Sequence, residues 1–99
     1  MGTTGDIQRV RYRFIGHVQH RGFRFACSVA ADAAQATGWV RNEPDGTVIA
    51  EVQASKEGQL AFVRRLSTIV PGLGYDWSVA HEEVVDLRGG EHGFTVRRF

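Results

Sequence analysis

Hydrophobic and polar residues alternate near the start of the chain, in the segment RVRYRFI at residues 9–15. Val10, Tyr12 and Phe14 would point to one side of an extended backbone and the arginines between them to the other, because successive side chains of a strand face opposite ways. This period of two, with one charged face, is typical of a strand that packs on a core with one side and meets solvent with the other. We therefore expect a first strand here.

The spacing of apolar and small residues becomes helical from Phe23 onward. Phe23, Cys27, Ala30 and Ala34 follow one another at intervals of three or four residues, which places them on one side of a helix. Gly38 comes next, and glycine readily adopts the left-handed conformation that commonly ends a helix. The pattern predicts a helix that begins at Phe23 and is capped by Gly38.

Two further strand-like segments, GWVRN at 38–42 and TVIAEVQA at 47–54, flank the tetrapeptide EPDG. A proline and an Asp-Gly pair are turn-forming, so the two segments should fold back on each other as a hairpin. The second strand is expected to direct four small or branched side chains to the core, namely Val48, Ala50, Val52 and Ala54.

A second helix should follow this hairpin. Ser55 is suited to cap it, because a serine hydroxyl accepts a hydrogen bond from the free backbone N–H groups at a helix start, and Pro71 with Gly72 would end it. Its inward-facing residues are expected to be Leu60, Val63, Leu66 and Val70. The segments YDWSVAHEEVVD, at 75–86, and GFTVRRF, at 93–99, supply one or two more strands.

The resulting element order is β-α-β-β-α-β with a possible extra C-terminal strand. It predicts an α+β protein with a ferredoxin-like two-layer sandwich, in which an antiparallel sheet carries two helices on one face. The chain has 99 residues, of which 42% are hydrophobic, and this is the size of a single domain with one core. We expect residues 1–6 to form a flexible tail and residues 7–99 to form that domain.

Composition narrows the classes of partner. Twelve Lys and Arg against eleven Asp and Glu leave a net charge of +1, which argues against nucleic acid as a partner, because nucleic-acid binding relies on several phosphate contacts. The sequence has no apolar run of the length that a bilayer requires. Its one cysteine, Cys27, cannot form an internal disulfide, so we expect a cytoplasmic protein, and we expect it to be monomeric.

One short stretch, HRGFRFACS at residues 20–28, is similar to the aromatic signature of RNA-recognition modules. In those modules the signature lies on the third strand, where its rings stack on bases. Here it follows the first strand and enters a helix, where Phe23 and Phe25 cannot both face an open sheet. Arg24 and Ser28 also replace a small and an aromatic residue of the signature, so we set base stacking aside.

The same stretch fits an anion-binding loop. Gly16 and Gly22 permit backbone angles that other residues resist, so the N–H groups between them can turn inward. The start of the helix adds its own unpaired N–H groups and the positive end of its dipole. Arg24, in the first turn, can donate two parallel hydrogen bonds to the same anion. A phosphoryl group is the ligand that this arrangement favours.

Two linked motifs resemble those of the acylphosphatase family. The first is Gly-x-Val-Gln, two residues, then x-Phe-Arg, at residues 16–24, and the second is Gly-Trp-Val-Arg-Asn-x-x-x-Gly-x-Val, at residues 38–48. The resemblance covers nearly the whole chain. It implies hydrolysis of the carboxyl–phosphate bond of acyl phosphates to a carboxylate and inorganic phosphate, without a metal, and we expect no other cofactor and no membrane partner.

The resemblance also implies a role for each site residue. Arg24 would bind the phosphate and Asn42 would orient the attacking water. The residues that would supply the rest of the phosphate-binding loop are Gln19, His20, Arg21, Gly22 and Phe23. A good leaving group makes positioning and charge stabilisation sufficient for this reaction, so no covalent nucleophile is required of the protein.

The chain departs from the family at two loop positions, since His20 and Arg21 stand where a Gly-Val pair is usual. If glycine supplies a left-handed angle there, His20 must adopt it at some energetic cost. For Arg21 two alternatives stay open: a second cation at the phosphate, or a side chain in solvent.

Other phosphatase chemistries lack their residues in this chain. Ala33 stands where a cysteine-phosphatase loop would need an arginine after Cys27, so we expect this thiol to be a buried small hydrophobe. The histidines show no paired spacing of metal ligands. The remaining alternative is a non-catalytic module of the same fold that binds an anion or a phosphorylated metabolite.

Overall fold

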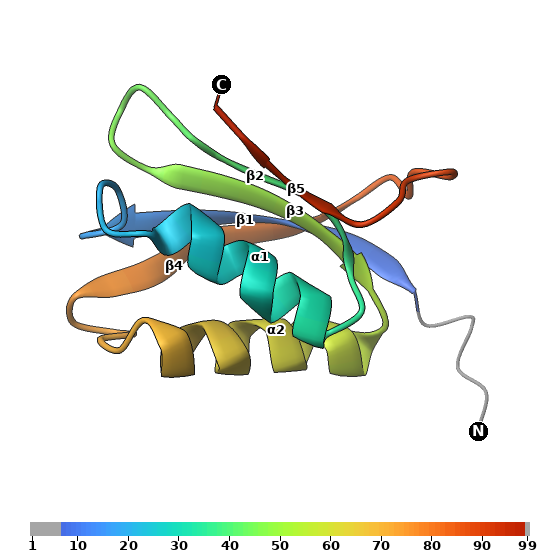
Figure 1. The fold of residues 1–99 in the computed structure, drawn as a ribbon, viewed down its shortest axis with the longest axis horizontal. Helices are drawn as coiled ribbons and strands as arrows, with labels where there is room; N and C mark the ends of the chain where they lie inside the picture. The colour runs from blue at the N-terminus through green and yellow to red at the C-terminus, as the bar shows by residue number, and fades with distance from the viewer. Residues whose placement is uncertain (1–6, 99) are drawn as a thin grey trace.

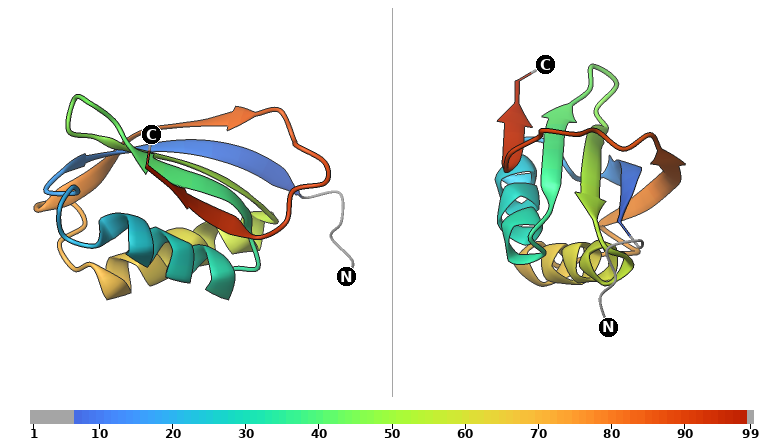
Figure 2. Two further views of the ribbon diagram at one scale, coloured as in Figure 1. Left: turned by 45° about the horizontal axis from the view of Figure 1, so that its top comes forward. Right: turned by 90° about the vertical axis from the view of Figure 1, so that its right-hand side faces the viewer.

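The structure is a computed structural model that describes residues 7–98, and these residues form five strands and two helices (Figure 1). The elements, in chain order, are β1 (Gln8–Gly16), α1 (Phe23–Ala33), β2 (Thr37–Asn42), β3 (Val48–Ala54), α2 (Lys56–Ile69), β4 (Trp77–Val85) and β5 (Phe94–Arg97). Both helices cover the same face of the sheet (Figure 2). The predicted ferredoxin-like α+β sandwich is confirmed. The tail expected at residues 1–6 lies outside the described residues.

The sheet has the strand order β4-β1-β3-β2-β5. It is mixed, and the expectation of an antiparallel sheet is wrong for one pair, because β5 lies parallel to β2. The reason is the path of the chain after β4, which crosses from one edge of the sheet to the other (Figure 2). Strands β4 and β2 run in opposite directions, so β4 ends at the same end of the sheet at which β2 begins. The connection follows that end of the sheet, so β5 begins beside the first residues of β2 and runs in the same direction.

The register brings the predicted core faces together. Val10 of β1 pairs with Val52 of β3, and Tyr12 pairs with Ala50, so the apolar positions of both strands face the helices. Val48, Ala50, Val52 and Ala54 are all buried, as the sequence predicts. The core therefore lies between the sheet and the two helices, and it supports the loop that enters α1.

Three aromatic rings pack edge to face beneath the start of α1. The ring centroid of Phe23 lies 5.2 Å from that of Phe14 on β1 and 5.0 Å from that of Trp77 on β4. All three side chains are buried. Such pairs stabilise a core beyond the area they bury, and here they hold the first residue of α1 against the sheet.

The two expected helix caps have different outcomes. Ser55 caps α2 as predicted, since its hydroxyl accepts a hydrogen bond from the N–H of Gly58 at 3.0 Å. Gly38 does not cap α1, which ends at Ala33, and Gln35 adopts the left-handed conformation instead, with φ of 55°. Gly38 lies inside β2, where a Cβ would overlap the carbonyl oxygen of Glu51 on β3. Close approach of the two strands is therefore the reason for this glycine.

The inward face of α2 differs from the prediction at Leu60, which is 65% exposed. Gln59 is buried in its place, and it accepts a hydrogen bond from the hydroxyl of Tyr12 at 2.6 Å. Phe62 and Leu66 complete the buried face. A helix turns about 100° per residue, so burial of Gln59 rotates its neighbour toward solvent.

The charged side of β1 also differs from the expectation. Arg9 is only 1% exposed, because its guanidinium is enclosed by two carboxylates. It donates to Glu51 at 2.6 Å and to both carboxylate oxygens of Glu91 at 2.8 and 3.1 Å.

Among residues 7–98 no helix is both long and apolar enough to cross a membrane.

Candidate active site

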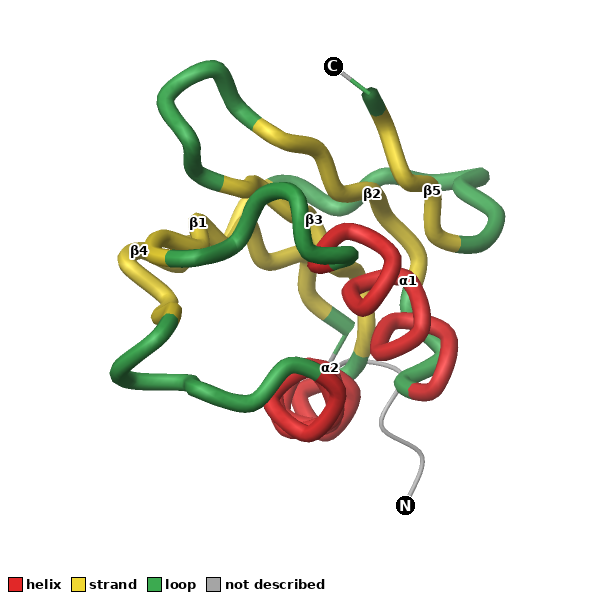
Figure 3. Tube along the Cα trace, turned by 60° about the vertical axis from the view of Figure 1, so that its left-hand side comes forward, coloured by secondary structure: helices red, strands yellow, loops and turns green. Residues whose placement is uncertain are grey.

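A loop at residues 17–22 joins the end of β1 to the start of α1 (Figure 3). Gly16, His20 and Gly22 all have left-handed backbone angles, with φ of 98°, 61° and 77°. At Gly16 a Cβ would lie 2.6 Å from the carbonyl oxygen of Asp76, so only glycine fits there. Val18 is buried and anchors the middle of the loop. The left-handed angle expected for His20 is therefore present.

The first turn of α1 has no side-chain cap. Gly22 is the N-cap, and it has no side chain that could accept from the first backbone N–H groups. The N–H groups of the first turn have no partner within a helix. Together with the positive end of the helix dipole, they suit an anion at this position.

Arg24 extends from this first turn toward β5. Its Nη1 donates a hydrogen bond to the carbonyl oxygen of Arg97 at 2.8 Å. The guanidinium of Arg97 lies over the ring of Trp39 on β2, 4.6 Å from the ring centroid, a cation–π contact that holds the end of β5 against the sheet. Residues far apart in the chain thus orient the Arg24 side chain.

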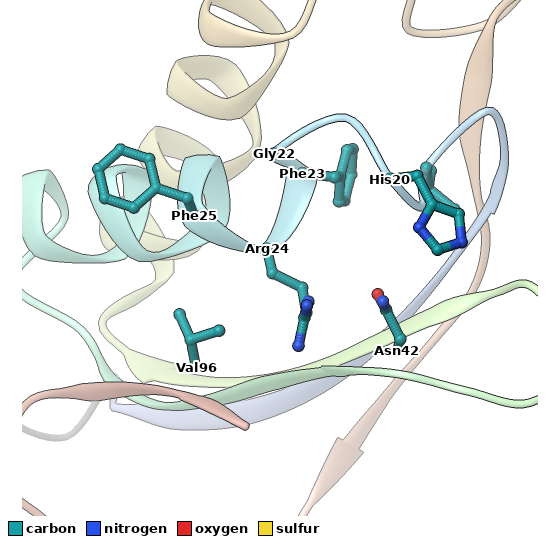
Figure 4. Close-up of a pocket in the computed structure, with 8 residues that line it drawn as sticks. His20, Gly22, Phe23, Arg24, Phe25, Asn42 and Val96 are labelled. Carbon is teal, nitrogen blue, oxygen red and sulfur yellow. The ribbon is translucent and has the colours of Figure 1, made fainter. Parts of the chain in front are cut away.

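Asn42, the last residue of β2, lies beside Arg24 (Figure 4). Its Oδ1 is buried and has no hydrogen-bond partner among the described residues. A buried acceptor without a partner costs about 1–3 kcal/mol, so this position favours a ligand or a water that donates a hydrogen bond to it.

Arg24 and Asn42 line one cavity of about 270 Å³. Its walls come from the loop, the first turn of α1 and the ends of β2 and β5 (Figure 4). The residues around it are Val18, His20, Gly22, Phe23, Arg24, Phe25, Asn42 and Val96. The cavity therefore combines a cation, free backbone N–H groups and an unpaired carboxamide oxygen, which suits a phosphoryl group and a water.

Gln19 does not face this cavity. Its Nε2 donates to the carbonyl oxygens of Glu43 and Thr47, at 2.9 and 2.8 Å, in the turn between β2 and β3. The side chain therefore joins the loop to the residue that follows Asn42. This contact fixes the distance between the two predicted halves of the site.

A family model for acylphosphatase matches residues 10–96 of the chain. The chain belongs to the acylphosphatase family. An acylphosphatase of Nocardioides sp. is 41% identical over 90 residues, which are 90% of this chain and 84% of the relative. An acylphosphatase of Geobacillus kaustophilus is 38% identical and covers 91% of this chain and 94% of the relative. The crystal structure of acylphosphatase from Bacillus subtilis superposes with a TM-score of 0.70 at 26% identity, over 92% of this chain and 98% of that one.

The side chain of Arg21 lies neither in the cavity nor free in solvent, the two alternatives that the sequence left open. Its guanidinium turns away from the cavity, forms an ion pair with Asp76 and donates to the carbonyl oxygen of His17 at 2.9 Å. The side chain is one quarter exposed. The hydrogen bond from Arg21 holds the pKa of Asp76 below its ordinary value. The sequence offers no signal for this pair, because its members are 55 residues apart.

Three cavity residues were not predicted as part of the site, and one of them, Val18, belongs to the loop itself. Val96 comes from β5, whose position depends on the connection after β4, and Phe25 belongs to the predicted helix, where helical spacing alone does not show which residue faces the cavity.

Cys27 is buried as expected, and burial raises the pKa of its thiol far above the ordinary value. Residues 7–98 contain no cluster of three His, Cys, Asp or Glu side chains suited to a metal ion.

Proposed function

We propose that this protein hydrolyses acyl phosphates, with Arg24 and the backbone N–H groups of residues 19–23 binding the phosphoryl group and Asn42 orienting the water. The observation that carries the proposal is the shared cavity. A guanidinium from α1 and an unpaired carboxamide oxygen from β2 line the same space beside a loop rich in left-handed angles. Membership of the acylphosphatase family supports the same reaction.

Binding in this cavity prepares the phosphoryl group for attack. Arg24 neutralises negative charge on its oxygens, and the N–H groups at the start of α1 donate to the same oxygens. Because the hydrogen bond to Arg97 fixes the guanidinium beforehand, little reorganisation is needed when charge shifts in the transition state.

The water donates a hydrogen bond to Oδ1 of Asn42, which directs a lone pair of the water oxygen at phosphorus. The new bond from that oxygen to phosphorus forms as the bond from phosphorus to the carboxyl oxygen breaks, and the carboxylate leaves with the electron pair. The proton lost by the water passes to a phosphoryl oxygen. Positioning can supply much of the acceleration, since the leaving group is already good.

The proposal includes a monomer that acts in the cytoplasm on a small-molecule acyl phosphate and releases inorganic phosphate, without a cofactor and without nucleic acid or a membrane as partner. The near-neutral net charge and the single buried cysteine support it. Gln19 and Arg21 act here by holding the loop, and His20, Gly22 and Phe23 line the phosphate cavity.

Hydrolysis of benzoyl phosphate, followed by its ultraviolet absorbance with a chelator present, tests this proposal. Replacement of Arg24 or Asn42 by Ala should each lower kcat/KM by roughly a hundredfold, as loss of one preorganised donor or acceptor commonly does. The matched control is Arg65→Ala, which removes an exposed arginine of α2 and should leave the rate unchanged. Wild-type rates in both site variants would overturn the mechanism, and phosphate binding without turnover would favour the non-catalytic alternative.

A further inference from the structure

Two exposed apolar side chains stand at the rim of the cavity. Phe25 of α1 is 70% exposed and Val96 of β5 is 43% exposed, and both line the cavity that holds Arg24. Scattered apolar residues are normal on a protein surface. These two come from different elements and both line the cavity proposed to bind the phosphoryl group, which needs no apolar wall for that purpose. Their placement therefore calls for a ligand that has an apolar part.

The geometry of the reaction determines where that part would lie. In phosphoryl transfer the attacking and leaving oxygens lie roughly in line, on opposite sides of phosphorus. Asn42 would hold the attacking water, so the acyl group must leave on the side away from Asn42. Figure 4 shows Phe25 and Val96 on the opposite side of Arg24 from Asn42 and His20.

We propose that Phe25 and Val96 form an acyl shelf that binds the acyl group of the substrate and favours apolar acyl groups, aryl or branched alkyl, over acetyl. This inference rests on the function proposed above. The shelf carries no charge of its own, and the arginine that lines the same cavity, Arg24, binds the phosphoryl group in the proposed mechanism. An acyl group with its own carboxylate would instead need Arg98, which lines a neighbouring cavity together with Arg24, Asn42 and Val96.

The shelf should act on binding more than on the chemical step. A hydrophobic contact with the acyl group is present in the bound substrate and in the transition state alike, and such uniform binding lowers KM without raising kcat. A residue that only maintained the fold would change kcat and KM for every acyl phosphate by the same factor. The ratio between substrates therefore separates the two roles.

The experiment compares benzoyl phosphate with acetyl phosphate in the wild type, Phe25→Ala and Val96→Thr. The intrinsic reactivity of each substrate is the same whichever variant is used. A change in the ratio of kcat/KM for benzoyl phosphate to kcat/KM for acetyl phosphate therefore reports the contact between the acyl group and the substituted side chain. We expect each substitution to lower the benzoyl-to-acetyl ratio by roughly five- to tenfold, mainly through KM, which is less than an enclosed pocket would give. Phe25→Ala should fold, because alanine is the best helix former.

Leu60→Ala is the matched control, since it removes an exposed apolar residue from α2 and should leave the ratio unchanged. An unchanged ratio in both shelf variants would overturn the inference, and so would a wild-type preference for succinyl phosphate that Arg98→Ala abolishes. Calorimetric binding of benzoylphosphonate and acetylphosphonate, which are not hydrolysed, tests the shelf without turnover. If the protein bound benzoylphosphonate more tightly than acetylphosphonate but hydrolysed neither acyl phosphate, the proposed function would be refuted and the acyl shelf would still be supported.

Discussion

The guanidinium of Arg21 forms an ion pair with the carboxylate of Asp76 and joins the loop between β1 and α1 to the turn that precedes β4. The backbone reinforces this link, because the N–H of His17 donates to the carbonyl oxygen of Asp76 at 2.9 Å. Arg21 therefore supports the loop from outside the cavity. It leaves the guanidinium of Arg24 as the cation inside.

We expect Arg21→Ala and Asp76→Ala each to lower kcat/KM for benzoyl phosphate by roughly tenfold, because small displacements of a binding loop strongly affect catalysis. The double variant should lose no more than the larger of the two single losses, since both remove the same ion pair. Steady-state kinetics of the four proteins measures this. Additive losses would mean that the two side chains act independently.

His20 adopts a left-handed backbone angle, with φ of 61°. Glycine takes this conformation freely, whereas a β-branched residue there is a strong outlier. The free energy of unfolding should therefore be about 1–2 kcal/mol lower for His20→Val than for His20→Gly. Urea denaturation of the two variants, with the wild type between them, provides the measurement, and equal midpoints would show that the angle relaxes.

Gly38 faces the carbonyl oxygen of Glu51 on the neighbouring strand with no space for a Cβ. Gly38→Ala should lower the free energy of unfolding by about 3 kcal/mol or more, because the backbones of β2 and β3 must separate. Gly89→Ala is the control, since a Cβ there meets open space, and it should change stability little. Thermal unfolding of both variants checks this, and a stable Gly38→Ala protein would contradict it.

Acid should weaken the fold through the buried cluster around Arg9. Two hydrogen bonds from this guanidinium hold the pKa of Glu91 below its ordinary value. Near the ordinary glutamate pKa of about 4.3 the folded protein then binds fewer protons than the unfolded chain, so the stabilisation is complete above that pH and is lost as the pH falls toward the folded-state pKa.

Urea midpoints between about pH 6 and pH 3 test this linkage. The wild type should lose stability more steeply than Glu91→Gln, which has no carboxylate to protonate at this position. Asp86→Asn, at an exposed position outside the ion pairs found among residues 7–98, should keep the wild-type slope. Equal slopes for the wild type and Glu91→Gln would show that this pair does not contribute.

Much of the fold was predictable because it depends on neighbours in the chain. The alternation around Tyr12, the turn residues of EPDG and the hydroxyl of Ser55 each act within a few residues, so strand, hairpin and helix cap follow from local chemistry. The same holds for the glycine-bearing loop that leads into Arg24. Gly38 shows the limit of this reasoning, since its partner, Glu51, lies on another strand.

The sequence by itself determined the elements, the apolar faces of β1 and β3, and the two motifs that identify the acylphosphatase family. Only the tertiary structure decided that β5 lies beside β2, which brings the carbonyl oxygen of Arg97 and the side chain of Val96 to the site. It also decided that Arg21 meets Asp76. Periodicity and caps are set by neighbouring residues, whereas these contacts depend on how the chain crosses the sheet and packs, which no local pattern records.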